Sequence, residues 1–224
     1  MRLRSVNVGT ARPMLVGGRR VLSAIGKQPV AGPVAVGRLG LAGDEQADPS
    51  VHGGLDKAVY AYPAEHLAFW QARRSEQGVS LWDEALASGF VGENLTIEGL
   101  LEADVWVGDE LRFPDCVLRV TAPREPCYKF NAVAGYAQAS RDMVQHNACG
   151  FYLAVQLGGT IAAGAASGSV SVAAPTDDVY LDAGFVSTAI ASASGGNFET
   201  LVVDPAAATT AISDTLDTTT VSIS

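Results

Sequence analysis

Short apolar stretches, separated by glycine, proline and aspartate, recur along the first 164 positions. They occupy residues 3–9, 32–41, 58–63, 93–100, 104–113, 116–123 and 150–164, and this pattern is typical of β-strands. Gly108 and Asp109 predict a hairpin turn inside the 104–113 stretch. Helical spacing of apolar residues is found at 63–77, 80–90 and 135–147. These elements predict a mainly β fold, a closed barrel with a few flanking helices.

The character of the chain changes at Ala165. From there to Ser224 the sequence is rich in Ala, Ser, Thr, Gly and Asp, with few aromatic residues. Residues 167–172 (SGSVSV) alternate as a strand does, and residues 177–205 contain enough apolar positions to form strands. We therefore expect a folded domain over residues 1–164 and a low-complexity tail over 165–224 that can form some β structure.

Composition and charge exclude several classes of protein. The net charge of −9 argues against a nucleic-acid polymer as partner, because phosphate binding needs a basic face. All 15 Lys and Arg lie between Arg2 and Arg141, whereas residues 158–224 hold seven acids and no base. No apolar run is long enough for a bilayer and no apolar signal region follows the first residues, so we expect a cytoplasmic protein without a membrane partner.

Four stretches combine charged residues and glycines next to expected strands: residues 25–31, 43–58, 92–95 and 123–129. Each alone could be a solvated turn. Together they bring polar groups to the rim of a rigid scaffold, where binding sites usually form. The candidate residues are Lys27, His52, Asp56, Lys57, Glu93, Asn94, Arg124, Cys127 and Lys129. The cations among them suit a phosphate or a carboxylate, which arginine can bind with two hydrogen bonds.

Cys127 is the strongest candidate for chemistry. Arg124 and Lys129 flank it, and nearby positive charge favours a thiolate, the form that attacks electrophiles or binds a soft metal. Pro123 and Pro126 restrict the backbone on its N-terminal side. The alternative is a buried small apolar side chain, which is the role we expect for Cys116 and Cys149.

Other motifs are missing from the sequence. The three cysteines are widely spaced and lack a CxxC pair, which fits neither a disulfide framework nor a structural zinc site and favours a reducing compartment. HExxH, GxGxxG, GxxxxGK[ST] and GxSxG do not occur. His66 and His146 fall in expected helices, where we expect surface or packing roles.

Several stretches in register resemble MOSC domains, named for the carboxy-terminal domain of molybdenum cofactor sulfurase. They are SAIGKQPV, LGLAGDEQADPSVHGGLDKAVYAYPAEHLAFW, GFVGENLTIEGLLEADVWVGDELRF, LRVTAPREPCYKF and GFYLAVQLGGTIAAG, within about residues 20–164. The chain resembles most the free-standing bacterial branch linked to resistance against 6-N-hydroxylaminopurine.

The resemblance implies a barrel-like fold that binds the molybdenum cofactor, a pterin with a phosphate and a dithiolene-held metal. Cys127 would ligate molybdenum or carry sulfur, and the other pocket residues would be Lys27, His52, Asp56, Lys57, Asn94, Arg124 and Lys129. The activity implied is reduction of small N-hydroxylated purines and related compounds, with electrons from a separate reductase. The alternative is a cofactor or persulfide carrier without turnover.

The tail departs from the family pattern. MOSC proteins usually continue past the GTIAAG strand with a glycine-aspartate turn and another strand, whereas Gly164 is followed here by the acidic tail. Its last residues, AISDTLDTTTVSIS, resemble linkers between Ig-like repeats of bacterial adhesins. A third hypothesis is therefore a domain that has lost a strand and its closed pocket, unless SGSVSV replaces that strand.

Overall fold

The computed structural model describes residues 1–48, 53–80, 84–165, 184–189, 206 and 208–212. Two compact units, Met1–Val170 and Ser171–Ser224, make up the chain. The strands of the first unit are β1 (Arg2–Val8), β2 (Arg12–Val16), β3 (Arg19–Ser23), β4 (Gln28–Pro29), β5 (Val34–Gly37), β6 (Gly40–Leu41), β7 (Val59–Pro63), β8 (Leu95–Glu98), β9 (Glu110–Arg112), β10 (Val117–Pro123), β11 (Phe151–Leu157) and β12 (Gly159–Ile161). Its helices are α1 (His66–Glu76), α2 (Lys129–Ala134) and α3 (Ala139–Gln145), with short 3-10 turns η1 (Leu55–Lys57) and η2 (Glu102–Asp104). No helix in these ranges has the length and apolar character needed to cross a bilayer.

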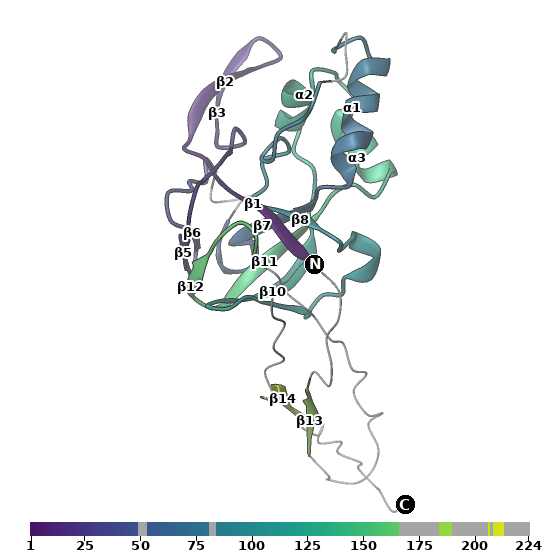
Figure 1. The fold of residues 1–224 in the computed structure, drawn as a ribbon. Helices are drawn as coiled ribbons and strands as arrows, with labels where there is room; N and C mark the ends of the chain where they lie inside the picture. Colours follow the sequence, from purple (N-terminus) through teal and green to yellow (C-terminus); the bar gives the residue numbers. More distant parts are fainter. Residues whose placement is uncertain (49–52, 81–83, 166–183, 190–205, 207, 213–224) are drawn as a thin grey trace, which may run out of the picture. The chain divides into compact units, whose positions relative to one another are not determined.

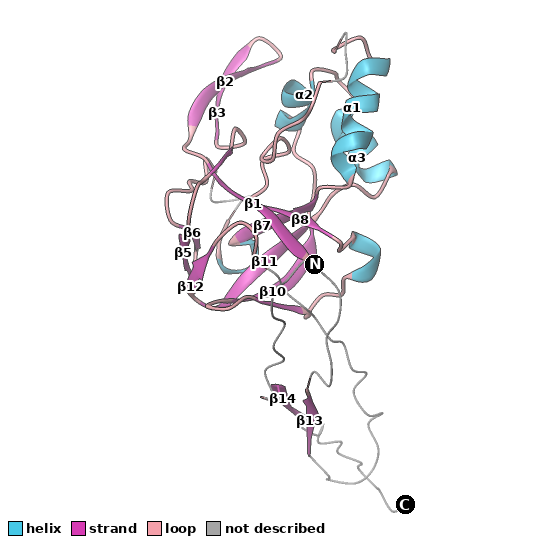
Figure 2. Cartoon of the chain, viewed as in Figure 1, coloured by secondary structure: helices cyan, strands magenta, loops and turns pink. Residues whose placement is uncertain are grey.

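A seven-stranded sheet forms the centre of the first unit, in the order β4-β1-β8-β7-β11-β10-β9. Figure 2 labels its inner strands β1, β8, β7, β11 and β10. Only β7 and β8 run parallel among its pairs. The mainly β prediction is confirmed, but within the described residues the edge strands β4 and β9 do not pair, so no closed barrel forms. Both edges are too short to close it, because β4 has two residues and β9 three, and Pro29 has no N–H to donate.

Two smaller sheets accompany the central one. Strands β12, β5 and β6 form a three-stranded sheet, and β2 and β3 form a separate hairpin (Figure 1). Gly17 and Gly18 join β2 to β3 with φ angles of 55° and 76°, the left-handed geometry of a tight hairpin turn.

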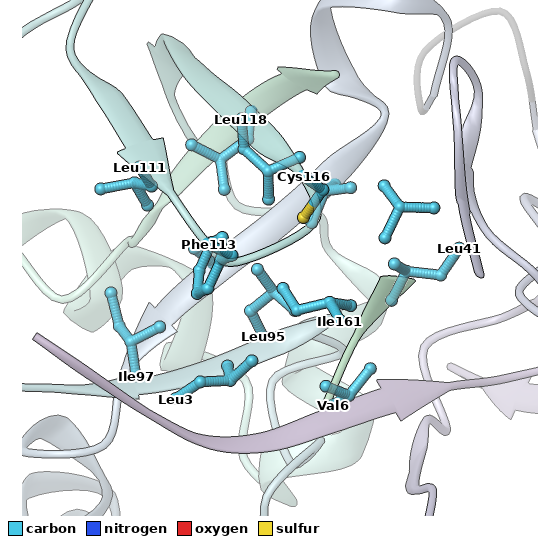
Figure 3. Close-up of a cluster of buried hydrophobic side chains, with 14 of the residues drawn as sticks. Leu3, Val6, Leu41, Leu95, Ile97, Leu111, Phe113, Cys116, Leu118 and Ile161 are labelled. Carbon is cyan, nitrogen blue, oxygen red and sulfur yellow. The ribbon is translucent and has the colours of Figure 1, made fainter. Parts of the chain in front are cut away.

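The central sheet separates two apolar clusters, and β7 supplies both. Val59 and Ala61 belong to the first cluster, whereas Tyr60 and Tyr62 belong to the second. This follows from the alternation of side chains along a strand, and all five residues of β7 are buried. Figure 3 shows the first cluster, where side chains such as Leu3, Leu95 and Leu118 point toward one another.

Helices α1, α2 and α3 contribute to the second cluster and lie together on one side in Figure 1. Leu67 and Trp70 form the buried stripe of α1. The Trp70 Nε1–H donates to the Tyr62 hydroxyl at 2.5 Å, and its ring meets Phe130 edge to face with centroids 4.9 Å apart. This packing fixes α2, the helix that follows Cys127.

Most expected elements are present, with two exceptions. The helices predicted at 63–77 and 135–147 correspond to α1 and α3. The helix predicted at 80–90 is wrong for Glu84–Phe90, which form a loop and a turn. There Glu84 pairs with Arg74, and the Gly89 N–H donates to the buried Glu93, contacts that outweigh helical propensity. Residues 105–107 form no strand, because Trp106 and Val107 are exposed.

The second unit contains an antiparallel pair, β13 (Gly184–Thr188) and β14 (Ala208–Ile212). Strand β13 lies in the 177–205 stretch for which we expected β structure, and β14 follows it. SGSVSV lies outside the described residues.

Candidate functional site

A cleft opens in the first unit where loops from both halves of the sequence meet. It encloses about 640 Å³ including its open mouth. Its lining residues come from the end of β3 and the loop after it, the loop after β6, η1 and β7, the loop before β8, the β10–α2 connection, the first residue of α2 and β11. They are Ser23, Ala24, Ile25, Lys27, Asp44, Glu45, Gln46, Ala47, Gly53, Lys57, Ala58, Tyr60, Gly92, Asn94, Arg124, Cys127, Lys129 and Tyr152.

Arg124 is a buried cation at the end of β10. Its side chain is 7% exposed, and its guanidinium lies over the Tyr60 ring, 4.8 Å from the centroid. Nη1 contacts the Met143 sulfur at 3.6 Å, while Nε is buried and has no hydrogen-bond partner in the described part of the chain. No carboxylate among the described residues forms an ion pair with it. A buried arginine in this situation is suited to an anionic ligand, because an anion would supply the missing charge and acceptors.

Cys127 and Lys129 form the adjoining wall. Cys127 is half-buried, and its carbonyl accepts the Phe130 N–H at 2.9 Å, which ties the residue to the first turn of α2. The Lys129 Nζ donates to the Leu22 carbonyl at 2.9 Å, joining α2 to β3. Lys57 lies across the cleft, with its Nζ 5.5 Å from the centre of the Tyr152 ring. One thiol and four cations, Lys27, Lys57, Arg124 and Lys129, therefore line a single cavity.

A buried polar network made by Lys27, Asp44 and Asn94 forms the floor. Lys27 is ion-paired with Asp44, whose carboxylate also accepts hydrogen bonds from the Gly9 N–H and the Asn94 amide, both at 2.9 Å. The Asn94 oxygen accepts the Tyr60 N–H at 3.1 Å, which links the network to β7. Burial lowers the pKa of Lys27, although Asp44 opposes this shift. The Lys27 ammonium thus releases its proton more easily than an exposed lysine would.

The loop before Asn94 is held by a fully buried carboxylate. Glu93 accepts hydrogen bonds from Gly89 N–H at 2.6 Å, Val91 N–H at 3.1 Å and the Thr96 hydroxyl at 2.7 Å. Burial raises the pKa of Glu93, which these donors partly counteract. Gly92 passes close to Ile25 with a φ of 84°, and a Cβ there would lie 2.7 Å from the Ile25 Cγ1. Glu93 therefore has a structural role beneath the cleft.

The structure brings together six of the residues proposed from the sequence: Lys27, Lys57, Asn94, Arg124, Cys127 and Lys129. Asp56 lies on η1 with an exposed side chain and does not line the cleft. His52 lies outside the described residues. Their roles as ligands of a cofactor stay predictions.

Three further residues of the cleft were not singled out by sequence reasoning. Asp44 lies in the charged 43–58 stretch, but its pairing with Lys27 depends on tertiary contact. Tyr60 and Tyr152 looked like ordinary strand residues, and their rings lie 5.7 Å apart around the cleft. Burial raises the pKa of both hydroxyls, so both stay protonated at neutral pH.

The remaining cysteines and histidines have packing roles. Cys116 is in the core and burial raises the pKa of its thiol to about 11. Cys149 packs against the second cluster, and His66 pairs with Glu102 at 2.8 Å. Among the residues that the structure describes, no group of three or more His, Cys, Asp or Glu could hold a metal ion. The cleft offers a metal one thiol, and its other charged groups are mostly cations. A metal held there would therefore need further ligands from the molecule that carries it.

Comparison with known proteins agrees with this picture. The MOSC domain model matches residues 48–166, more than half of the chain, and a LapA domain model matches residues 153–215. The uncharacterized protein YflK of Bacillus subtilis is 36% identical over 161 residues, 72% of this chain and 69% of YflK. A protein named reductase from Gibberella moniliformis is 33% identical over 163 residues, 72% of this chain but only 28% of its own length.

Solved structures extend the comparison to the fold. The crystal structure of YiiM from Geobacillus stearothermophilus superposes with a TM-score of 0.58 and 34% identity, over 76% of this chain and 75% of that one. The family match, the relatives and the fold agree on the same part of the sequence. The chain belongs to the MOSC domain family.

Proposed function

We propose that this chain binds the molybdenum cofactor in its cleft and reduces N-hydroxylated purines and related N-oxygenated compounds with electrons from a separate protein. The observation that carries the proposal is Arg124, a buried cation without an acidic partner in the described residues, in the same cavity as the Cys127 thiol. The reductase name of one relative supports the reaction type.

The residues present fit the cofactor. Its phosphate needs a cation that no carboxylate neutralises, and among the described residues none pairs with Arg124. Its metal needs a soft donor, which is the thiol of Cys127. The pterin needs room, which the open cleft provides. Lys57 and Lys129 add positive charge along the same walls.

When bound, the cofactor supplies two-electron chemistry that amino-acid side chains lack. Reduction of an N-hydroxyl group consumes two electrons and two protons and yields an amine and water. We assign Lys27 Nζ as one proton source, because it lines the cleft, is held by Asp44, and has a lowered pKa. The rings of Tyr60 and Tyr152 line the same cavity, 5.7 Å apart.

The test is the molybdenum and pterin content of the protein purified from a host that makes the cofactor, compared with Cys127→Ala. Cys116→Ala is the matched control, since it removes a thiol from the core and not from the cleft. We expect near-stoichiometric molybdenum in wild type and control, and loss in Cys127→Ala. Metal-free wild-type protein would refute the proposal.

Turnover is then measured with 6-N-hydroxylaminopurine and reduced methyl viologen, with adenine as the expected product. A loaded protein that makes no adenine and reduces no other N-hydroxylated compound would favour the carrier alternative.

A further inference from the structure

The amino-terminal part of this acidic chain is basic. Residues 1–43 contain seven Lys and Arg and neither Asp nor Glu, whereas the whole chain has a net charge of −9. Hairpin β2–β3 carries Arg12, Arg19 and Arg20, all exposed. Within the described residues no carboxylate forms an ion pair with them, although most arginines of the sheet and helices are paired. The hairpin is therefore a local positive region.

One side of the hairpin is also apolar. Pro13 is opposite Leu22 and Leu15 is opposite Arg20, so these four side chains share one side of the ribbon, which we name the hairpin face, whereas Arg12 and Arg19 lie on the other side. Leu15 is 66% exposed and Leu22 is 51% exposed. Exposed apolar side chains rimmed by one sign of charge mark a protein interaction surface.

The hairpin leads directly to the cleft. Ser23, the last residue of β3, lines the cavity together with the next two residues. Lys129, two residues after Cys127, donates from Nζ to the Leu22 carbonyl at 2.9 Å. A protein bound at the hairpin face would therefore sit beside the wall that carries the thiol.

We propose that the hairpin face docks an acidic electron-carrier protein, a small flavin or iron–sulfur protein whose negative surface meets Arg20 and is also attracted by the charge of Arg12 and Arg19 on the other side of the same two-stranded ribbon. This inference rests on the proposed function. Each N-hydroxyl group that is reduced to an amine and water takes up two protons and two electrons, and the reduced carrier becomes oxidised as it gives up those two electrons. Weak electron-transfer encounters have small interfaces, in keeping with a surface of a few residues. Complementary charge would raise the association rate and make it fall with salt.

A second copy of this chain fits the hairpin face less well. A two-fold contact would place Arg20 of one copy close to Arg20 of the other, with the remaining hairpin arginines nearby, and like charges across an interface oppose association. The acidic carrier is therefore the occupant that the charge pattern favours.

The experiment uses the full-length protein and flavodoxin, a small acidic FMN protein, as probe. Binding of oxidised flavodoxin is measured by titration calorimetry at low and high salt, and turnover is measured with reduced flavodoxin and separately with reduced methyl viologen. In R19E/R20E we expect the affinity for flavodoxin and the flavodoxin-driven turnover at low salt to fall about tenfold or more, with the methyl viologen rate unchanged. The matched control is R2E/R141E, which reverses two exposed arginines elsewhere and should keep both rates.

The outcomes separate the two proposals. If flavodoxin binds R19E/R20E and wild type equally, or does not bind wild type, the hairpin face is not the docking surface. This conclusion holds whether or not the protein reduces N-hydroxylated compounds. Wild type that binds flavodoxin at the hairpin but reduces no N-hydroxylated compound even with methyl viologen overturns the proposed function alone. Concentration-dependent dimerisation that L15N and L22N abolish would instead assign the hairpin face to a second copy.

Discussion

Replacement of Arg124 by methionine tests whether this buried cation is there for a ligand or for the fold. An arginine in a buried ion pair costs about 3–5 kcal/mol to remove, because its partner is left unpaired. Arg124 has no such partner in the described residues. Replacement by methionine removes the desolvated cation–π contact with Tyr60, which destabilises the folded protein by about 2 kcal/mol. It also removes a buried donor without a described partner, which stabilises the folded protein by about 1–3 kcal/mol.

These contributions nearly cancel, so we expect Arg124→Met to change the free energy of unfolding of the cofactor-free protein by less than about 1 kcal/mol. The assay is urea unfolding, with Arg119→Met as a control at an exposed site. The same proteins are heated with inorganic phosphate, which should raise the midpoint of wild type and control but not of Arg124→Met. A loss of 3 kcal/mol, or phosphate protection that persists in the variant, would refute a ligand role for Arg124.

Three further changes test the scaffold of the cleft. Asp44→Asn should cost about 3–5 kcal/mol in urea unfolding, because it leaves the buried Lys27 ammonium unpaired; a cost under 1 kcal/mol would show that Lys27 is solvated. Gly92→Ala should lower stability by about 1–3 kcal/mol, because φ is 84° and the added Cβ clashes, and a neutral result would contradict this backbone path. Burial would raise the pKa of Asp142, but hydrogen bonds from Arg73 and Tyr136 lower it below its usual value of 3.8. The contribution of this carboxylate to the free energy of unfolding is therefore complete above pH 3.8 and is lost as the pH falls through the pKa that Asp142 has in the folded protein. Asp142→Asn should therefore flatten the acid side of the stability–pH curve, whereas an unchanged slope would exclude this carboxylate as its source.

The strands could be predicted because they depend on local patterns. Alternation and turn residues identified β1, β7, β8, β10 and β11, and a buried stripe identified α1. Closure of the sheet could not be predicted, since it depends on the edge strands β4 and β9, which have two and three residues. The helix expected at 80–90 is wrong for Glu84–Phe90, because Glu84 pairs with Arg74 on α1 and the Gly89 N–H donates to the buried Glu93. The contact with Arg74 depends on tertiary packing, which a local pattern does not show.

The site was predicted as a set of charges and one thiol, and the structure gathers most of them. The sequence could not predict which cations form ion pairs. Lys27 pairs with Asp44, whereas no described carboxylate pairs with Arg124. This difference separates a structural cation from one available to a ligand. The roles of Tyr60 and Tyr152 were also hidden, because strand alternation alone does not tell which buried face opens onto a cavity.

The order of the lining residues along the chain has a consequence for biosynthesis. The cleft needs residues from Ser23 to Tyr152, and its strands pair across long separations, as β1 does with β8 and β7 with β11. At bacterial and eukaryotic translation speeds, the 130 residues from Ser23 to Tyr152 take roughly 6 to 26 s to make. During that interval the polar groups of the floor are still in water. A ligand can therefore be captured only after β11 has left the ribosome, so that loading follows synthesis of the domain.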